Sequence, residues 1–166
     1  MQHSTGYIVG FAVAICLVCA LLVSTSAVGL KDRQDANKLL DRQKKVLIVA
    51  GMMQDGERLS REQITSLFDS SIQQKIIDLK TGEPAPGIDV ASFDQRTLAS
   101  NPNTSYEAPT NISRIRRMPN NAMVFDVIEN GKLKALILPI EGYGLWGTLY
   151  GYIALAPDAR TIVGIT

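Results

Sequence analysis

The sequence predicts an α+β protein in which an N-terminal transmembrane helix and a stalk helix precede a small antiparallel-sheet domain. Three observations support this: an uncharged apolar run near the amino terminus, helical spacing of apolar residues in the next fifty positions, and β-prone runs toward the carboxyl end. Helices followed by a series of strands are typical of the α+β class. The expected domains are a transmembrane anchor at 1–30, a helical stalk at 31–58 and an α+β domain at 59–166.

The run Tyr7 to Leu30 carries no charged residue and is long enough to cross a hydrocarbon core of about 30 Å as a helix. A cleavable signal peptide is the alternative, because Thr25-Ser26-Ala27 resembles a cleavage site. The apolar run is longer than a signal peptide requires, however, and the leader has no Lys or Arg. A retained anchor is therefore favoured.

Both cysteines, Cys16 and Cys19, fall within the expected span. A C-x-x-C pair is compatible with redox chemistry or half of a metal site, but no further Cys or His lies nearby to complete a zinc set. Packing within the membrane is the favoured role, and no metal site is expected.

The charges around the span leave its orientation open. Six basic residues follow it at once, whereas only the amino terminus and His3 precede it. The positive-inside rule would keep the following domain in the cytoplasm, but the rule weakens when a long domain follows the span. The six residues are Lys31, Arg33, Lys38, Arg42, Lys44 and Lys45.

Two helices are expected after the span. The first continues from the membrane to a stop at Gly51, and the second begins at a capping box formed by Ser60 and Gln63 and ends near Gly82. Each has apolar residues spaced by three and four. These are Ala36, Leu39, Leu40, Leu47 and Ala50 with Gln43 in the first, and Ile64, Leu67, Phe68, Ile72, Ile76 and Leu79 in the second.

The segment from Glu83 to Asn111 is rich in Pro, Asn and Ser, which predicts an irregular connection with short extended pieces. A small basic cluster, Arg114, Arg116 and Arg117, follows it. Such a cluster can hold a phosphate or a partner's carboxylate, although a solvated surface is the more usual role.

Strands are expected from Ala122 onward. Asn130-Gly131 between two β-prone runs predicts a hairpin, Leu145 to Leu155 is the expected third strand, and TIVGIT begins a fourth. In the third strand Gly147 and Gly151 would share one face. Glycine in a strand often marks a close approach by a ligand or another backbone. The alternative is that a helix packs against the glycine face of this strand, while the aromatic residues on its other face form part of the core.

The composition excludes several classes of function. With 17 Lys and Arg against 16 Asp and Glu, nucleic acid is an unlikely target. His3 is the only histidine, so the soluble part has no Ser-His or Cys-His pair, and no phosphate-binding loop or dinucleotide fingerprint is present. No catalytic side chain is therefore expected, and any chemistry would depend on a cofactor.

Three segments carry a resemblance to a known family. SAVGLKDRQDANKLLDRQKKVL, GKLKALILPIEGYGLWGTLYGYIAL and DARTIVGIT together resemble the C subunit of the sodium-translocating NADH:quinone oxidoreductase, over nearly the whole chain. The resemblance implies a single-pass inner-membrane protein with a periplasmic, FMN-binding-type domain. It also implies that the protein relays electrons through FMN, together with the other subunits of a complex that couples NADH oxidation and quinone reduction to Na+ export. Its implied flavin-lining residues are Gly142, Gly144, Leu145 and Trp146.

The chain departs from the family pattern in one respect. The family's FMN is attached through its phosphate to a threonine in an S-G-A-T-type motif, and this sequence has no such motif. We therefore expect the chain to be the amino-terminal portion of a longer protein, with an incomplete sheet and no covalent flavin of its own.

Two other functions suit the same predicted architecture. A membrane-anchored extracytoplasmic sensor or binding module without redox activity would also need a span, a stalk and a small α+β domain. A structural assembly subunit without cofactor is the third possibility.

Overall fold

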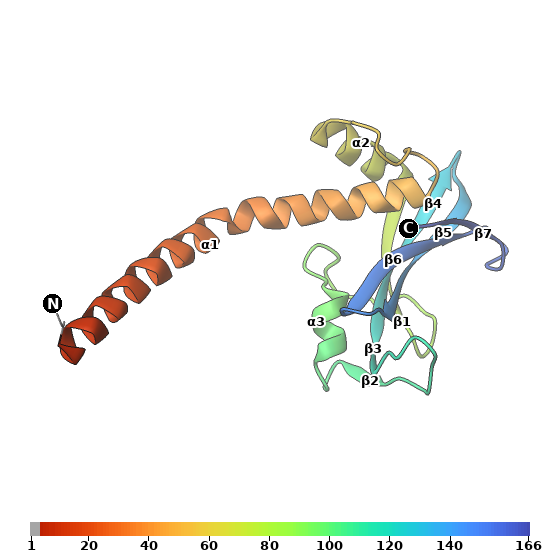
Figure 1. Cartoon of the computed structure of the whole chain (residues 1–166). Helices are drawn as coiled ribbons and strands as arrows, with labels where there is room; N and C mark the ends of the chain where they lie inside the picture. Colours follow the sequence, from red (N-terminus) through yellow and green to blue (C-terminus); the bar gives the residue numbers. More distant parts are fainter. Residues whose placement is uncertain (1–3) are drawn as a thin grey trace. The chain divides into compact units, whose positions relative to one another are not determined.

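A computed structural model describes residues 4–166, so His3 lies outside the described residues. It confirms a long apolar helix followed by an antiparallel-sheet domain, and the chain divides into two compact units, the second of which is Leu40–Thr166. Figure 1 shows the elements in chain order. They are α1 (Thr5–Val49), α2 (Arg61–Ser71), β1 (Ile72–Asp78), α3 (Gln95–Ser100), β2 (Ser105–Glu107), β3 (Arg117–Pro119), β4 (Asn121–Glu129), β5 (Lys132–Tyr143), β6 (Thr148–Leu155) and β7 (Ile162–Ile165).

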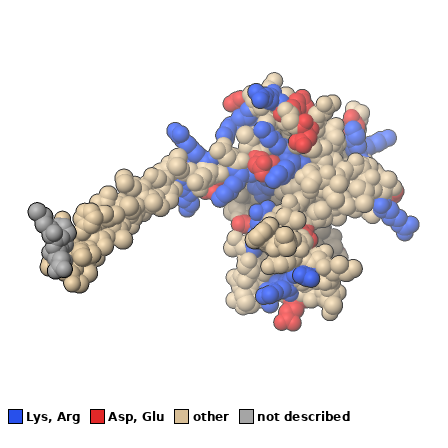
Figure 2. Space-filling model, in the orientation of Figure 1, with Lys and Arg blue, Asp and Glu red and all other residues tan. Residues whose placement is uncertain are grey.

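The first unit ends at Leu39 and contains the apolar part of α1. Among the described residues, α1 is the one helix long and apolar enough to cross a membrane. Its large apolar side chains from Tyr7 to Leu30 are exposed, as lipid-facing side chains would be. Free Cys16 and Cys19 are exposed on the same helix. Figure 2 shows an uncharged surface along this segment.

The last turns of α1 belong to the core of the second unit. Val46 and Leu47 are fully buried there, and the helix ends as expected at Gly51, whose φ of 71° is the left-handed conformation of a helix C-terminus. The Met52 N–H donates to the Leu47 carbonyl over 2.9 Å and closes this cap. The proposed stalk, 31–58, thus includes residues that the sheet domain needs for its core.

Helix α2 begins as predicted but ends earlier. Ser60 and Gln63 form the full capping box, with the Ser60 N–H donating to Gln63 Oε1 over 2.8 Å. The prediction that the helix continues to Gly82 is wrong, because Ile72 already begins strand β1. Ile72 and Ile76 are both buried, and residues four apart share one face in a strand as well as in a helix. Their spacing therefore did not distinguish the two structures.

The main sheet has five antiparallel strands in the order β1-β4-β5-β6-β7. The predicted hairpin at Asn130-Gly131 joins β4 and β5, and both residues have positive φ, 52° and 72°. The ends of α1 and α2 pack on one face of the sheet. On that face the Phe125 ring meets Phe68 and Tyr152 edge-on, at centroid distances of 6.2 and 5.7 Å.

Two further expectations needed correction. The segment 83–111 contains the short helix α3 as well as the extended piece β2, because Asp94 caps α3 by accepting hydrogen bonds from the Arg96 and Thr97 N–H groups. The third strand begins at Thr148 rather than Leu145. Residues 144–147 instead form the turn of the β5–β6 hairpin, in which the Gly144 N–H donates to the Gly147 carbonyl over 2.8 Å.

Candidate functional site

The four residues that the resemblance implies lie together at the end of β5 and in the turn that follows. Gly142 pairs with Leu149 across the hairpin, and the neighbouring Tyr143 N–H donates to the Ser113 carbonyl over 2.8 Å. Gly144 begins the turn. Leu145 and Trp146 project from it with 88% and 96% of their surface exposed. Trp146 is therefore not a core residue, whereas Tyr152, further along β6, packs against the core.

The two glycines expected to share one strand face, Gly147 and Gly151, have different surroundings in the structure. Gly151 faces another backbone, because a Cβ built on it would overlap the Thr166 carbonyl oxygen. Gly147 has open space around its Cβ position, and its φ of 154° reflects the turn. The predicted close approach is thus confirmed at Gly151 but wrong at Gly147, which lies outside the strand.

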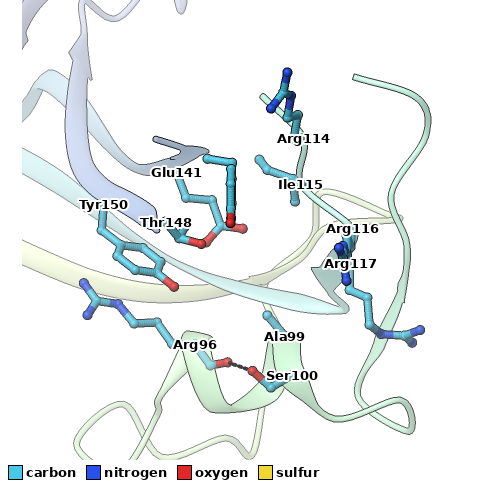
Figure 3. A pocket seen from close by; sticks show the side chains of 11 residues that line it. Arg96, Ala99, Ser100, Arg114, Ile115, Arg116, Arg117, Glu141, Thr148 and Tyr150 are labelled. Atoms are coloured by element: carbon cyan, nitrogen blue, oxygen red, sulfur yellow. Dashed lines mark hydrogen bonds between the residues drawn. The ribbon is translucent and has the colours of Figure 1, made fainter. Parts of the chain in front are cut away.

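A cleft of about 420 Å³ lies beside these residues, between α3, the loop before β3 and the adjoining ends of β5 and β6. Figure 3 shows side chains from all of these segments around it. Its lining contains four arginines and a single carboxylate, so its charge is strongly positive. The lining residues are Arg96, Ala99, Ser100, Arg114, Ile115, Arg116, Arg117, Glu141, Tyr143, Thr148 and Tyr150.

The arginines of the cleft have different local environments. Arg117 is used internally, since its Nε donates to Ser105 Oγ and its Nη2 to the Ser105 carbonyl, each over 2.8 Å. The Arg96 guanidinium lies over the Tyr150 ring, 3.8 Å from its centroid, in a cation–π contact that joins α3 to β6. Within residues 4–166, Arg96, Arg114 and Arg116 form no ion pair with a carboxylate.

The loop that carries Arg114 is held in place by Asn111. The Asn111 Oδ1 accepts from the Ile115 N–H over 2.9 Å, and its Nδ2 donates to the carbonyls of Pro109 and Ile115. Arg114 itself has a φ of 55°, a left-handed conformation that is uncommon outside glycine. This bonding fixes the course of the loop along the cleft.

On the opposite wall, Asp94 holds the first turn of α3. Burial would raise the pKa of the Asp94 carboxyl, but hydrogen bonds from the Thr97 side chain and from the Thr97 and Arg96 N–H groups outweigh it and lower that pKa. The carboxylate therefore stays ionised near neutral pH and secures the helix that positions Arg96.

The candidate site combines a flat apolar element with a basic one. The hairpin turn offers an exposed indole and an exposed Leu side chain next to two glycines, which suits a planar aromatic group. Among the described residues, no three His, Cys, Asp or Glu side chains gather as they would around a metal ion.

Comparison with known proteins gives this chain named relatives. No family model matches the chain. A curated protein of Pseudomonas aeruginosa, the C subunit of Na(+)-translocating NADH-quinone reductase, is 39% identical over 165 residues, which is 98% of this chain and 62% of that protein. The C subunit of the same enzyme from Vibrio vulnificus is 36% identical over 95% of this chain and 60% of its own length.

This chain is a homologue of these C subunits. The crystal structure of NqrC from Shewanella oneidensis agrees, with a TM-score of 0.69 and 33% identity over 81% of this chain and 59% of that one. The C subunit from Parabacteroides distasonis, at 22% identity and a TM-score of 0.58, shares the fold. The chain spans about three fifths of the length of the curated C subunits that it matches.

Sequence reasoning found part of the site. It singled out Arg114, Arg116 and Arg117 but missed Arg96, because α3 was not expected. The signal for α3 was present in Asp94 and Thr97, whose spacing matches a helix N-cap with a third-position partner. Glu141 and Tyr150 were missed as cleft residues because the hairpin turn was expected before Leu145, whereas β5 continues to Tyr143 and β6 begins only at Thr148.

Proposed function

We propose that this chain is the flavoprotein C subunit of a membrane complex that couples NADH oxidation and quinone reduction to Na+ export. The observation that carries the proposal is the similarity to named C subunits over 98% of the chain. The uncharged part of helix α1, from Tyr7 to Leu30, would anchor the protein in the inner membrane, and the domain from Leu40 onward would lie in the periplasm with the other subunits as its partners.

The cofactor of this proposal is FMN, which supplies one-electron and two-electron transfer when bound. The residues proposed to line its ring are Gly142, Gly144, Leu145 and Trp146. The exposed faces of Leu145 and Trp146 give a planar ring an apolar surface, and the glycines leave the backbone open beside it. Packing there would exclude water from one face of the ring.

The test isolates the complex through an affinity tag on this chain, from membranes of cells that produce it. We expect further membrane subunits to copurify, with bound flavin and NADH:quinone reductase activity that Na+ stimulates. A chain that purifies alone from active membranes would overturn the proposal and favour a sensor or binding module.

The proposed lining is tested in the same complex. Trp146→Ala and Leu145→Ala should lower its flavin content, because the apolar support of the ring is lost. Ile162→Ala, which removes an apolar side chain that is 60% exposed on β7, serves as the matched control. Equal flavin content in all three variants would exclude the hairpin turn as the flavin site.

A further inference from the structure

The cleft beside the hairpin contains cationic groups that the described part of the chain does not neutralise. Arg96, Arg114 and Arg116 are exposed and have no carboxylate partner within residues 4–166. Arg117 differs from these three, because its guanidinium already donates hydrogen bonds to Ser105 and to the Pro102 carbonyl. We infer that the cleft is a docking site for an acidic polypeptide segment of a neighbouring protein.

The arrangement of the arginines favours an extended ligand over a compact anion. They come from two separate segments, α3 and the loop before β3. In Figure 3 the Arg96 side chain lies along Tyr150, while Arg114 extends from the opposite rim away from the cleft, so the guanidinium groups do not converge on one point. A phosphate group is bound best by donors that converge on it. Carboxylates spaced along a peptide match separated guanidinium groups.

Glu141 supports the same choice of ligand. Glu141 lies on β5 and contributes its carboxylate to the lining of the cleft, where it would repel a compact dianion. A peptide can place its carboxylates near the arginine rim and a neutral residue near Glu141. The charge pattern therefore selects for the order of residues in the segment as well as for its total charge.

The rest of the lining has the composition of a protein interface. Tyr143 and Tyr150 are 56% and 44% exposed beside the arginines, and Tyr and Arg are among the residues enriched at the energetic centres of interfaces. The Asn111 hydrogen bonds already order the loop, and the Tyr150 contact already orders Arg96. Binding would thus cost little additional ordering of the site.

The experiment measures binding of fluorescein-labelled octaglutamate to the whole chain in a neutral detergent, by fluorescence anisotropy. We expect saturable binding that weakens as the salt concentration rises from about 0.05 to 0.5 M, because the charges are exposed and screened. Arg114→Gln and Arg116→Gln should each weaken it by about two- to fivefold, as expected for single exposed charge pairs. The triple variant with Arg96→Gln should weaken it by about tenfold or more.

A control with the same change in net charge separates the cleft from the overall charge of the chain. It is the triple variant Lys132→Gln, Lys134→Gln and Arg160→Gln, in the first residues of β5 and in the turn after β6. Lys132 is nine residues from Glu141 along β5, or about 30 Å. This variant should bind octaglutamate within about twofold of the unmodified chain.

Two outcomes would overturn the inference. One is equal weakening in the two triple variants, which would mean non-specific attraction. The other is complete displacement of the peptide by inorganic phosphate at equal charge concentration, which would mean a small-anion site. The single variants at Arg114 and Arg116 keep the test valid if loss of the Arg96–Tyr150 contact unfolds the triple variant, as circular dichroism would show.

Discussion

At the scale of single residues, glycine has distinct roles in this sheet. Gly164 on β7 lies against the end of α1, and a Cβ built on it would overlap the Val49 carbonyl oxygen. Val49 is itself buried, so the helix end cannot move away without disturbing the core. Gly142 has room, since the nearest atom to its Cβ position is Ser113 Cβ at 3.7 Å. The same residue type thus permits helix–sheet contact at one position and is optional for packing at the other.

The first prediction concerns this difference. Gly164→Ala should lower the free energy of unfolding by about 1–3 kcal/mol, because the added methyl group overpacks a backbone contact. Gly142→Ala is the control and should change it by less than about 0.5 kcal/mol. Urea unfolding of the whole chain, followed by circular dichroism, measures both free energies of unfolding. Equal stability of the two variants would contradict the close contact between Gly164 and the Val49 carbonyl.

The second prediction concerns Asp158 in the β6–β7 turn. Hydrogen bonds from the Thr161 side chain and from the Thr161 and Arg160 N–H groups lower the pKa of Asp158 from 3.8 to about 2. Because the folded-state pKa is the lower one, the stabilisation is present above pH 3.8 and is lost as the pH falls through about 2.

Carboxyl NMR titration of the whole chain should therefore give Asp158 a midpoint near pH 2. The Thr161 amide resonance should move with it, because the Thr161 N–H donates to Asp158 Oδ1 over 2.9 Å. In Asp158→Asn the Thr161 resonance should lose this titration. A midpoint at the ordinary aspartate value would show that the turn is open in solution.

At the scale of elements, the caps and turns explain which predictions succeeded. The Ser60 and Gln63 box and the Asn130-Gly131 turn depend on local backbone groups, so a few adjacent residues define them. The change from α2 to β1 at Ile72 is different. Pairing of Ile76 with Met123 on β4 decides it, and such a distant partner leaves no trace in the local spacing.

The hairpin turn at 144–147 illustrates a second limit of sequence reasoning. Trp146 and Leu145 favoured extending β6 to include them, because they continue the apolar and aromatic run of that strand. The register of β5 with β6, in which Tyr143 pairs with Thr148, instead requires a connection at these residues. The candidate flavin-lining residues are neighbours in sequence, but their exposure on a turn depends on pairing between strands.

The third prediction tests the cap of α2. Ser60→Ala should lower the free energy of unfolding by about 0.5–2 kcal/mol, because the Gln63 N–H loses its acceptor and the reciprocal bond weakens. Ser70→Ala, at an exposed position in the last turn of the same helix, is the control and should be near neutral. Chemical unfolding of both variants measures the difference. A neutral Ser60→Ala would mean that packing of Ile64 and Phe68 alone fixes the helix start.

At the scale of the whole molecule, the proposed function and the flanking charges favour opposite orientations of the sheet domain. The basic residues after the span favour a cytoplasmic domain, whereas the proposed role as a C subunit requires a periplasmic one. Translocation of a long domain proceeds largely regardless of flanking charge, so the periplasmic orientation is the one that we propose.

The fourth prediction decides this question. Ser92→Cys places a thiol on an exposed loop of the sheet domain, and a membrane-impermeant thiol reagent should label it in cells whose outer membrane has been made permeable. The unmodified chain is the control, because Cys16 and Cys19 lie within the apolar part of α1. Labelling that appears only after the inner membrane is broken would place the domain in the cytoplasm.

The position of Trp146 also determines how this protein can be observed. It is the sole tryptophan of the chain, and 96% of its surface is exposed at the hairpin tip. Its intrinsic emission should already resemble that of indole in water, so global denaturation will change the emission wavelength little. Any molecule that covers the tip should shift the emission to shorter wavelengths. The intrinsic fluorescence of Trp146 therefore reports directly on binding at the candidate site, without an added label.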